Sequence, residues 1–159
     1  MAAAGSGLIA SATNGAIATV AMSAVMIVGD RMSLMGEQPP TVITRKALRD
    51  LGVDRPSKPA ALLAPVAHLG FGVAGGVTYR LTRRFVPRVP GGLLGVAFGL
   101  AVWTVSYQGW IPAMGFRPPP EDDRPGRPAV MLAAHVAYGL VLGGLSRPRQ
   151  IGDSSSSER

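Results

Sequence analysis

The sequence contains no cysteine, which excludes disulfides, thiolate metal sites and cysteine nucleophiles. It also lacks an H-E-x-x-H pair, a glycine-rich phosphate loop, and any spacing of serine, histidine and carboxylate that is typical of a catalytic triad. Charged residues make up only 16% of the 159 residues, and phenylalanine occurs four times. These absences predict a protein that is not an enzyme and binds no metal ion through a dedicated protein site.

Charge is missing altogether from four long windows, at 7–29, 60–79, 89–116 and 129–146. A transmembrane helix needs about 20 predominantly apolar residues, so these windows are long enough, or nearly so, to cross a bilayer. The 21 glycines suit helices that approach closely inside lipid. We therefore predict an all-α integral membrane four-helix bundle within residues 1–148, with helices at about 8–28, 60–79, 92–111 and 129–146.

Two of these windows share the frame H-x-x-[FY]-G-x-x-x-G-x-x-x-R. It is filled first by His68, Phe71, Gly72, Gly76 and Arg80, and then by His135, Tyr138, Gly139, Gly143 and Arg147. Met-Gly-x-x-Pro-Pro also occurs twice, at 35–40 and 114–119, each time between an apolar window and a histidine window. This repetition predicts two parallel hairpin repeats related by an axis along the membrane normal.

Within each histidine window the histidine, the two glycines and the arginine follow at steps of four, so they share one helix face. The G-x-x-x-G spacing favours close contact with another helix, and the aromatic residue would fill the crossing. Asn14 lies in the first window, where an unpaired amide would be costly in lipid. We expect its side chain to form a hydrogen bond with a neighbouring helix.

The connections are more polar than the windows. Residues 41–51 place apolar side chains on one side and charged ones on the other, which predicts a short amphipathic helix in the first loop. This helix would lie at the membrane surface or cover the end of the bundle. Residues 117–128 are rich in proline and charge, so we expect an extended, exposed loop. The polar tail, 149–159, is predicted to be disordered.

The net charge of +7 suggests nucleic acid at first, but the cations lie at the borders of the apolar windows. Cations in such positions set membrane topology or contact anionic lipid, so we expect no nucleic-acid partner. Cytoplasmic N- and C-termini are favoured by the arginines that follow the two histidine windows, Arg80, Arg83, Arg84 and Arg147.

The favoured function is an accessory or interaction module of a membrane assembly, without a cofactor. In this interpretation the histidines and aromatic rings fill helix crossings and the glycines permit close packing. The expected partners are the lipid bilayer and either other membrane-protein subunits or a second copy of the chain.

Two alternatives stay open. His68 and His135 could ligate a b-type haem, because two neutral imidazoles at matched depth on different helices are what axial ligation requires. Close packing at the glycines would leave no slot for the porphyrin. An oligomeric transporter or channel could instead use both histidines with Asn14, Tyr107 and Gln108. That path lacks an intramembrane acid to relay a proton or pair with a cation.

The chain resembles the YagU-like group of small, uncharacterised bacterial inner-membrane proteins. The resemblance rests on the glycine-rich helix around His68, the region 112–119, and His135 at the start of the last helix. It covers about residues 60–145 and departs in total length and in the first loop. What the resemblance implies is location in the bacterial inner membrane, and it implies no reaction and no site residue.

Overall fold

The computed structural model describes the backbone of residues 2–146 and the side chains of residues 5–146. Two predicted features, Arg147 at the end of the second frame and the polar tail 149–159, lie outside the described residues.

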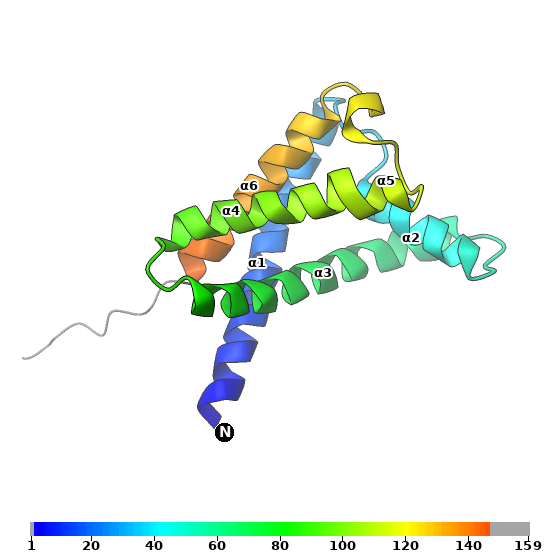
Figure 1. Ribbon diagram of the computed structural model, residues 1–159. Helices are drawn as coiled ribbons and strands as arrows, with labels where there is room; N and C mark the ends of the chain where they lie inside the picture. Colours follow the sequence, from blue (N-terminus) through cyan, green and yellow to red (C-terminus); the bar gives the residue numbers. More distant parts are fainter. Residues whose placement is uncertain (1, 147–159) are drawn as a thin grey trace, which may run out of the picture.

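The structure is helical, and the described residues include no β-strand (Figure 1). Its elements are α1 (Ala2–Arg31), α2 (Pro39–Asp50), α3 (Ser57–Phe85), α4 (Gly91–Trp103), the π-helix η1 (Thr104–Trp110), α5 (Ile111–Ala113), the short 3-10 helix η2 (Pro120–Asp122) and α6 (Arg127–Leu145). Four stretches are long and apolar enough to cross a membrane, at 5–31, 57–85, 91–113 and 127–145. The prediction of an all-α chain with four such helices is confirmed, whereas the two parallel hairpin repeats stay a prediction.

α1 and α3 run further at both ends than the charge-free windows that predicted them. α3 continues through Arg80, Arg83 and Arg84 to Phe85, so the prediction that Arg80 ends its helix is wrong. The physical reason is that arginine is a good helix former, and the first charge ended the apolar window without ending the helix. Similarly, Pro39 and Pro40 begin α2, because proline fits the first turn of a helix, where its missing N–H has no partner to lose.

The long helices pack in the spatial order α3, α1, α6, α4. α1 packs against α3 on one side and against α6 on the other, and α4 packs against α6 (Figure 1). Although α3 and α4 follow each other in the chain, they make few contacts with each other. The arrangement is therefore more open than the predicted closed bundle, and the opening lies between α3 and α4.

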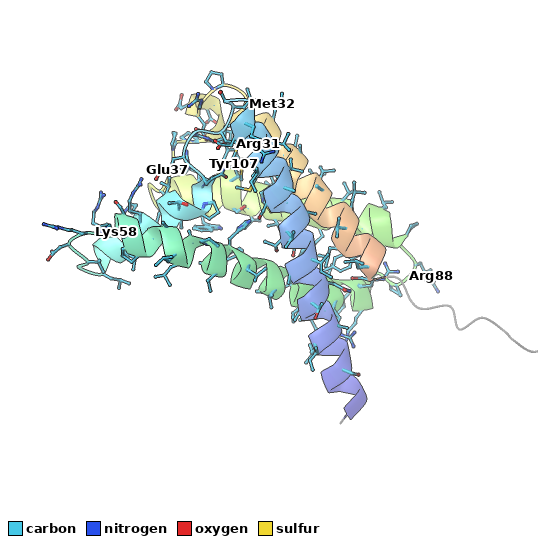
Figure 2. The ribbon with its side chains drawn as sticks, turned by 180° about the vertical axis from the view of Figure 1, so that it is seen from behind. Arg31, Met32, Glu37, Lys58, Arg88 and Tyr107 are labelled. Carbon is cyan, nitrogen blue, oxygen red and sulfur yellow. The ribbon has the colours of Figure 1, made fainter. Side chains whose placement is uncertain are left out.

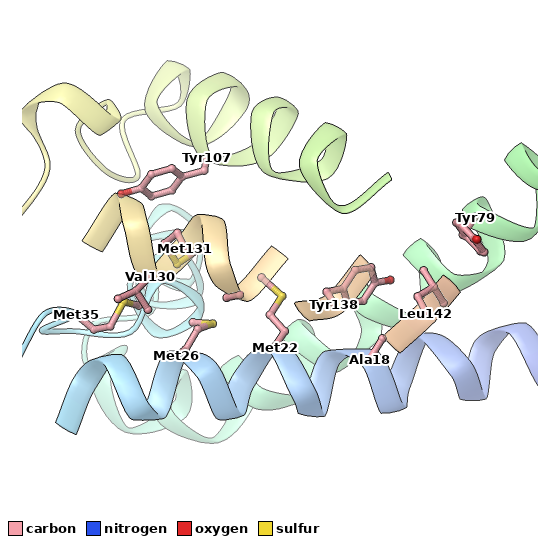
Figure 3. Close-up of a cluster of buried hydrophobic side chains, with 11 residues drawn as sticks. Ala18, Met22, Met26, Met35, Tyr79, Tyr107, Val130, Met131, Tyr138 and Leu142 are labelled. Carbon is pink, nitrogen blue, oxygen red and sulfur yellow. The ribbon is translucent and has the colours of Figure 1, made fainter. Parts of the chain in front are cut away.

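Methionine and tyrosine side chains form much of the core. Figure 3 shows Met22 and Met26 of α1 directed toward Met131 and Val130 of α6. Unbranched methionine fits irregular gaps between helices, which suits helices that cross at differing angles. Many large apolar side chains on the outside are exposed, including Leu62, which is 77% exposed. Exposed apolar surface of this extent fits a bilayer environment.

Candidate functional site

Glycines bring the long helices together in two pairs. A methyl group on Gly15 of α1 would lie 2.3 Å from the carbonyl oxygen of Gly72 in α3. In the other pair, a methyl group on Gly95 of α4 would lie 2.1 Å from the carbonyl oxygen of Gly139 in α6. Gly76 and Gly143 show equally close backbone contacts. Each histidine helix therefore packs through its two framed glycines against the apolar helix that precedes it in the chain.

The face that these contacts leave open forms a large apolar cavity between α3 and α4, which we call the histidine cleft. Its volume is about 590 Å³. α1, α2 and α6 also contribute to its wall, and the polar and aromatic residues in the lining include His68, Phe71, Trp110, His135 and Tyr138. Both framed histidines therefore line the same cavity.

The two imidazoles differ in their hydrogen bonds. Nδ1 of His135 lies 2.8 Å from the carbonyl oxygen of Met131, and the side chain is buried. A carbonyl only accepts, so in the neutral ring Nδ1 carries the hydrogen and Nε2 holds the lone pair. Nε2 of His68 is buried without a hydrogen-bond partner. Backbone support of this kind at one ring nitrogen orients a histidine whose other nitrogen binds a ligand.

The framed aromatic residues have unequal surroundings. Tyr138 is buried, and its hydroxyl donates to the carbonyl oxygen of Gly72 at 2.9 Å, which links α6 to α3. By contrast, Phe71 is 59% exposed and its ring centroid lies 6.2 Å from that of Trp110. Only Tyr138 therefore fills a helix crossing, while Phe71 and Trp110 meet across the histidine cleft.

The amphipathic helix α2 forms part of the wall of the cleft. It packs against α3, and its residues Pro39, Pro40, Ile43 and Thr44 line the cavity. Elsewhere on α2, the ammonium of Lys46 lies 5.5 Å from the ring centroid of Phe116. The two positions predicted for this helix, at the membrane surface or over the end of the bundle, both stay predictions.

A buried polar cluster closes the same end of the molecule. Tyr107 donates to Oδ2 of Asp123 at 2.6 Å, and Arg127 pairs with Oδ1 of the same carboxylate. Arg127 Nε also donates to the carbonyl oxygen of Met35 at 2.7 Å, while Arg117 lies 4.0 Å from Asp123. Figure 2 shows Tyr107 and Glu37 at this end of the molecule, away from Arg88. The cluster connects the loop after α1 with η1 and the start of α6.

This cluster is not among the features predicted from the sequence. An exposed loop was predicted for 117–128, yet the Asp123 side chain is only 1% exposed. One signal was present, because Asp123 and Arg127 stand four residues apart at the start of α6, the spacing of a helical ion pair. The prediction was wrong because hydrogen bonds with Tyr107 and with the Met35 carbonyl compensate the burial of these charges.

Near the C-terminal end of α3, Asn14 of α1 and the arginines of α3 line the same cavity. The Asn14 amide donates to the Ser146 hydroxyl at 3.4 Å, across from α1 to the end of α6. Arg80, Arg83 and Arg84 line a second cavity beside this pair. Gln108, the remaining residue of the predicted transport path, is exposed and does not line the histidine cleft.

An ion pair between Glu37 and Arg45 joins the loop before α2 to α2 itself, and its contribution to stability can be tested. Its carboxylate accepts two hydrogen bonds from Arg45, one of them 2.7 Å long, and these bonds lower the pKa of Glu37 from its ordinary value. A lowered folded-state pKa stabilises the fold above the ordinary pKa, and this contribution is lost as the pH falls through the folded value. Since the side chain is 45% exposed, we expect a loss of at most about 0.5 kcal/mol.

The measurement is the thermal unfolding midpoint of the wild type and of Glu37→Gln, at neutral pH and at a pH well below the ordinary pKa of glutamate. The two proteins should differ at neutral pH and converge at low pH. Glu121→Gln is the control, because Glu121 is exposed and forms no ion pair within the described part of the chain. A difference that persists at low pH would contradict the assignment.

Comparison with known proteins gives a family and nothing more specific. A family model described as "Family of unknown function (DUF6789)" matches residues 5–150, a range that includes both histidine helices. The searches of curated proteins and of solved structures gave no match. Nothing in this match concerns the YagU-like group, so that resemblance stays a prediction. Because the matched range extends over much more than half of the sequence, the chain belongs to DUF6789, a family of unknown function.

Proposed function

We propose that this chain is an accessory module of a membrane assembly, without catalytic chemistry of its own, which binds a hydrophobic molecule in the histidine cleft. The observation that carries the proposal is the cavity of about 590 Å³, whose apolar wall holds both framed imidazoles. Binding sites for small molecules typically measure roughly 300–1,000 Å³ and combine an apolar lining with a few converging polar groups. The histidine cleft has both properties.

The two imidazoles determine which polar group a bound molecule must carry. In the neutral tautomer that the Met131 contact favours, Nε2 of His135 is a hydrogen-bond acceptor or metal ligand. Nε2 of His68 is buried without a partner, an arrangement that costs free energy unless a ligand supplies one. The cleft therefore suits an apolar molecule that carries a hydroxyl or another donor, or one that carries a metal ion.

A b-type haem is the second candidate, and one observation favours it. The framed glycines bring α1 close to α3 and α4 close to α6, so their close contacts do not fill the space between α3 and α4. The slot that the glycines were expected to remove is therefore present, with His68 and His135 on its wall. Bound haem would supply one-electron transfer, and the two imidazoles would hold it.

The proposal also includes the location of the chain and its assembly with other subunits. The chain would lie in the bacterial inner membrane with both termini in the cytoplasm, which the cations Arg80, Arg83 and Arg84 near the end of α3 support. The two glycine-mediated helix pairs support a repeat of two hairpins. A second copy of the chain or another subunit would pack on the exposed apolar faces.

The test is to purify the full chain in a mild detergent and to record its absorption spectrum and its native mass spectrum. We expect a retained hydrophobic molecule that His68→Ala and His135→Ala each lose, and a Soret band with the same dependence if the molecule is haem. Ala67→Phe, which fills the histidine cleft, should also release it. Leu69→Ala is the matched control, because this neighbouring side chain is 41% exposed and does not line the cleft.

The outcomes separate the candidates. A colourless preparation that retains a molecule excludes haem and supports another hydrophobic ligand. If neither a mass nor a colour is retained, and adding hydrophobic ligands leaves the unfolding midpoint unchanged, the ligand-binding proposal is wrong. Histidine-dependent solute flux in liposomes would instead favour transport.

A further inference from the structure

A second cavity lies between α1, the last turns of α3 and the end of α6, and we call it the arginine cavity. Its volume is about 430 Å³. The polar residues that line it are Ser11, Asn14, Arg80, Arg83, Arg84 and Ser146. The cavity is distinct from the histidine cleft, because the two linings share no residue.

Positive charge in the arginine cavity is not compensated by acidic residues. No aspartate or glutamate lines it, and within residues 5–146 no ion pair includes any of the three arginines. Arg83 donates to the carbonyl oxygen of Val89 at 3.0 Å, and this bond holds its guanidinium at the end of the helix. Nε of Arg80 is buried without a hydrogen-bond partner. Three guanidinium groups that repel one another would gain from an anion between them.

The chain also makes room for the Arg80 guanidinium. A methyl group on Gly7 of α1 would lie 2.3 Å from Nη2 of Arg80, so glycine at this position leaves room for the guanidinium where it lies. The planar guanidinium presents a fork of donors that matches the oxygens of a phosphate. Near it, the Asn14 side chain and the Ser146 hydroxyl add neutral polar groups.

Each of the three helices around the arginine cavity carries an exposed leucine near it in the sequence, and one of these, Leu145, lines the cavity. Leu8 of α1, Leu81 of α3 and Leu145 of α6 are each about half exposed, at 46%, 45% and 46%. They belong to three apolar helices that meet at the cavity, each long enough to cross a membrane. A ligand that fits both features has an anionic head and apolar chains. Basic pockets between transmembrane helices bind lipid head groups in this way.

We propose that the arginine cavity binds the phosphate head group of an anionic phospholipid, with Arg80 and Arg84 as its principal ligands and the acyl chains against the three exposed leucines. Arg83 has the structural bond to Val89 and acts as a further charge. This proposal does not depend on the ligand of the histidine cleft.

The experiment uses the full chain in detergent and titrates it with phosphatidylglycerol or phosphatidylcholine, with lipid binding read by native mass spectrometry. The wild type should prefer phosphatidylglycerol, and the double variant Arg80→Gln with Arg84→Gln should bind it about 30-fold more weakly. Arg84→Gln alone should lose about fivefold. Because Arg84 is exposed, the single variant tests the site even where the double variant fails to fold.

The matched control is Arg49→Gln with Arg55→Gln, which removes the same charge from two exposed arginines outside the cavity. This variant should bind phosphatidylglycerol as the wild type does. Three results would overturn the proposal. They are equal binding of the two lipids, an equal loss in the control variant, and displacement of the lipid by inorganic phosphate, which would identify a site for a free anion.

Discussion

Replacing Gly95 with valine is expected to force α4 away from α6 and to cause a large loss of stability. A methyl group at this position would lie 2.1 Å from the carbonyl oxygen of Gly139 and 2.9 Å from the Cα of Gly143. Both obstacles are backbone atoms, which cannot move aside as a flexible side chain would. Overpacking of this kind costs about 1–3 kcal/mol, and here the upper end or more is expected.

The measurement is thermal unfolding of the purified chain in detergent, followed by the helical circular dichroism signal. Gly92→Val in the same helix is the matched control, because a methyl group on Gly92 would meet nothing within 4 Å. Both variants change glycine to valine in α4, so their intrinsic helix propensities change alike. Equal midpoints for the two variants would contradict the assigned contact between α4 and α6.

Asp123→Ala is expected to lower the free energy of unfolding by about 3–5 kcal/mol, the range for removing one partner of a buried ion pair. The carboxylate accepts from Tyr107 and from Arg127, and the side chains of Asp123 and Arg127 are 1% and 8% exposed. Without the carboxylate, Arg127 remains a buried cation whose nearest compensation is the Met35 carbonyl. The cost is therefore mainly that of the charge left behind.

Denaturant or thermal unfolding again measures the effect. Asp122→Ala is the control, because it removes the same charge from the neighbouring, exposed position. The double variant Asp123→Ala with Arg127→Met should recover part of the loss, since it removes the stranded cation as well. If Asp123→Ala and Asp122→Ala were equally stable, the cluster would be no more than a surface ion pair.

Much of the fold could be predicted from hydropathy and glycine spacing. The charge-free windows located all four long helices because a continuous apolar run has few other stable uses. Their ends were less predictable: arginine extends α3 as well as an apolar residue would, so the first charge did not mark the end. The frame placed His68 and His135 in equivalent positions, and the structure brings both to one cavity.

The histidine cleft itself could not be predicted from the sequence. G-x-x-x-G indicates that a helix has a close neighbour, but it does not say which helix that is. Here Gly72 meets α1 and Gly139 meets α4, so the framed glycines give each histidine helix a different partner. The burial of Asp123 was equally hidden, because its donors come from Tyr107, sixteen residues earlier in the chain, and from the start of α6.

The π-helix η1 has a consequence for register. The N–H of Ile111 donates to the carbonyl oxygen of Ser106, five residues back, so the wide turn accommodates one residue more than an α-helical turn would. An α-helix turns about 100° per residue, so if the same residues continued as a regular α-helix, everything beyond this turn would be rotated by about that angle. Trp110 would leave the wall of the histidine cleft, while Gly91, Gly95 and Gly99 would keep their contacts with α6. The extra residue in this turn therefore determines how Trp110, which lines the histidine cleft, is rotated relative to the glycines of α4 that pack against α6.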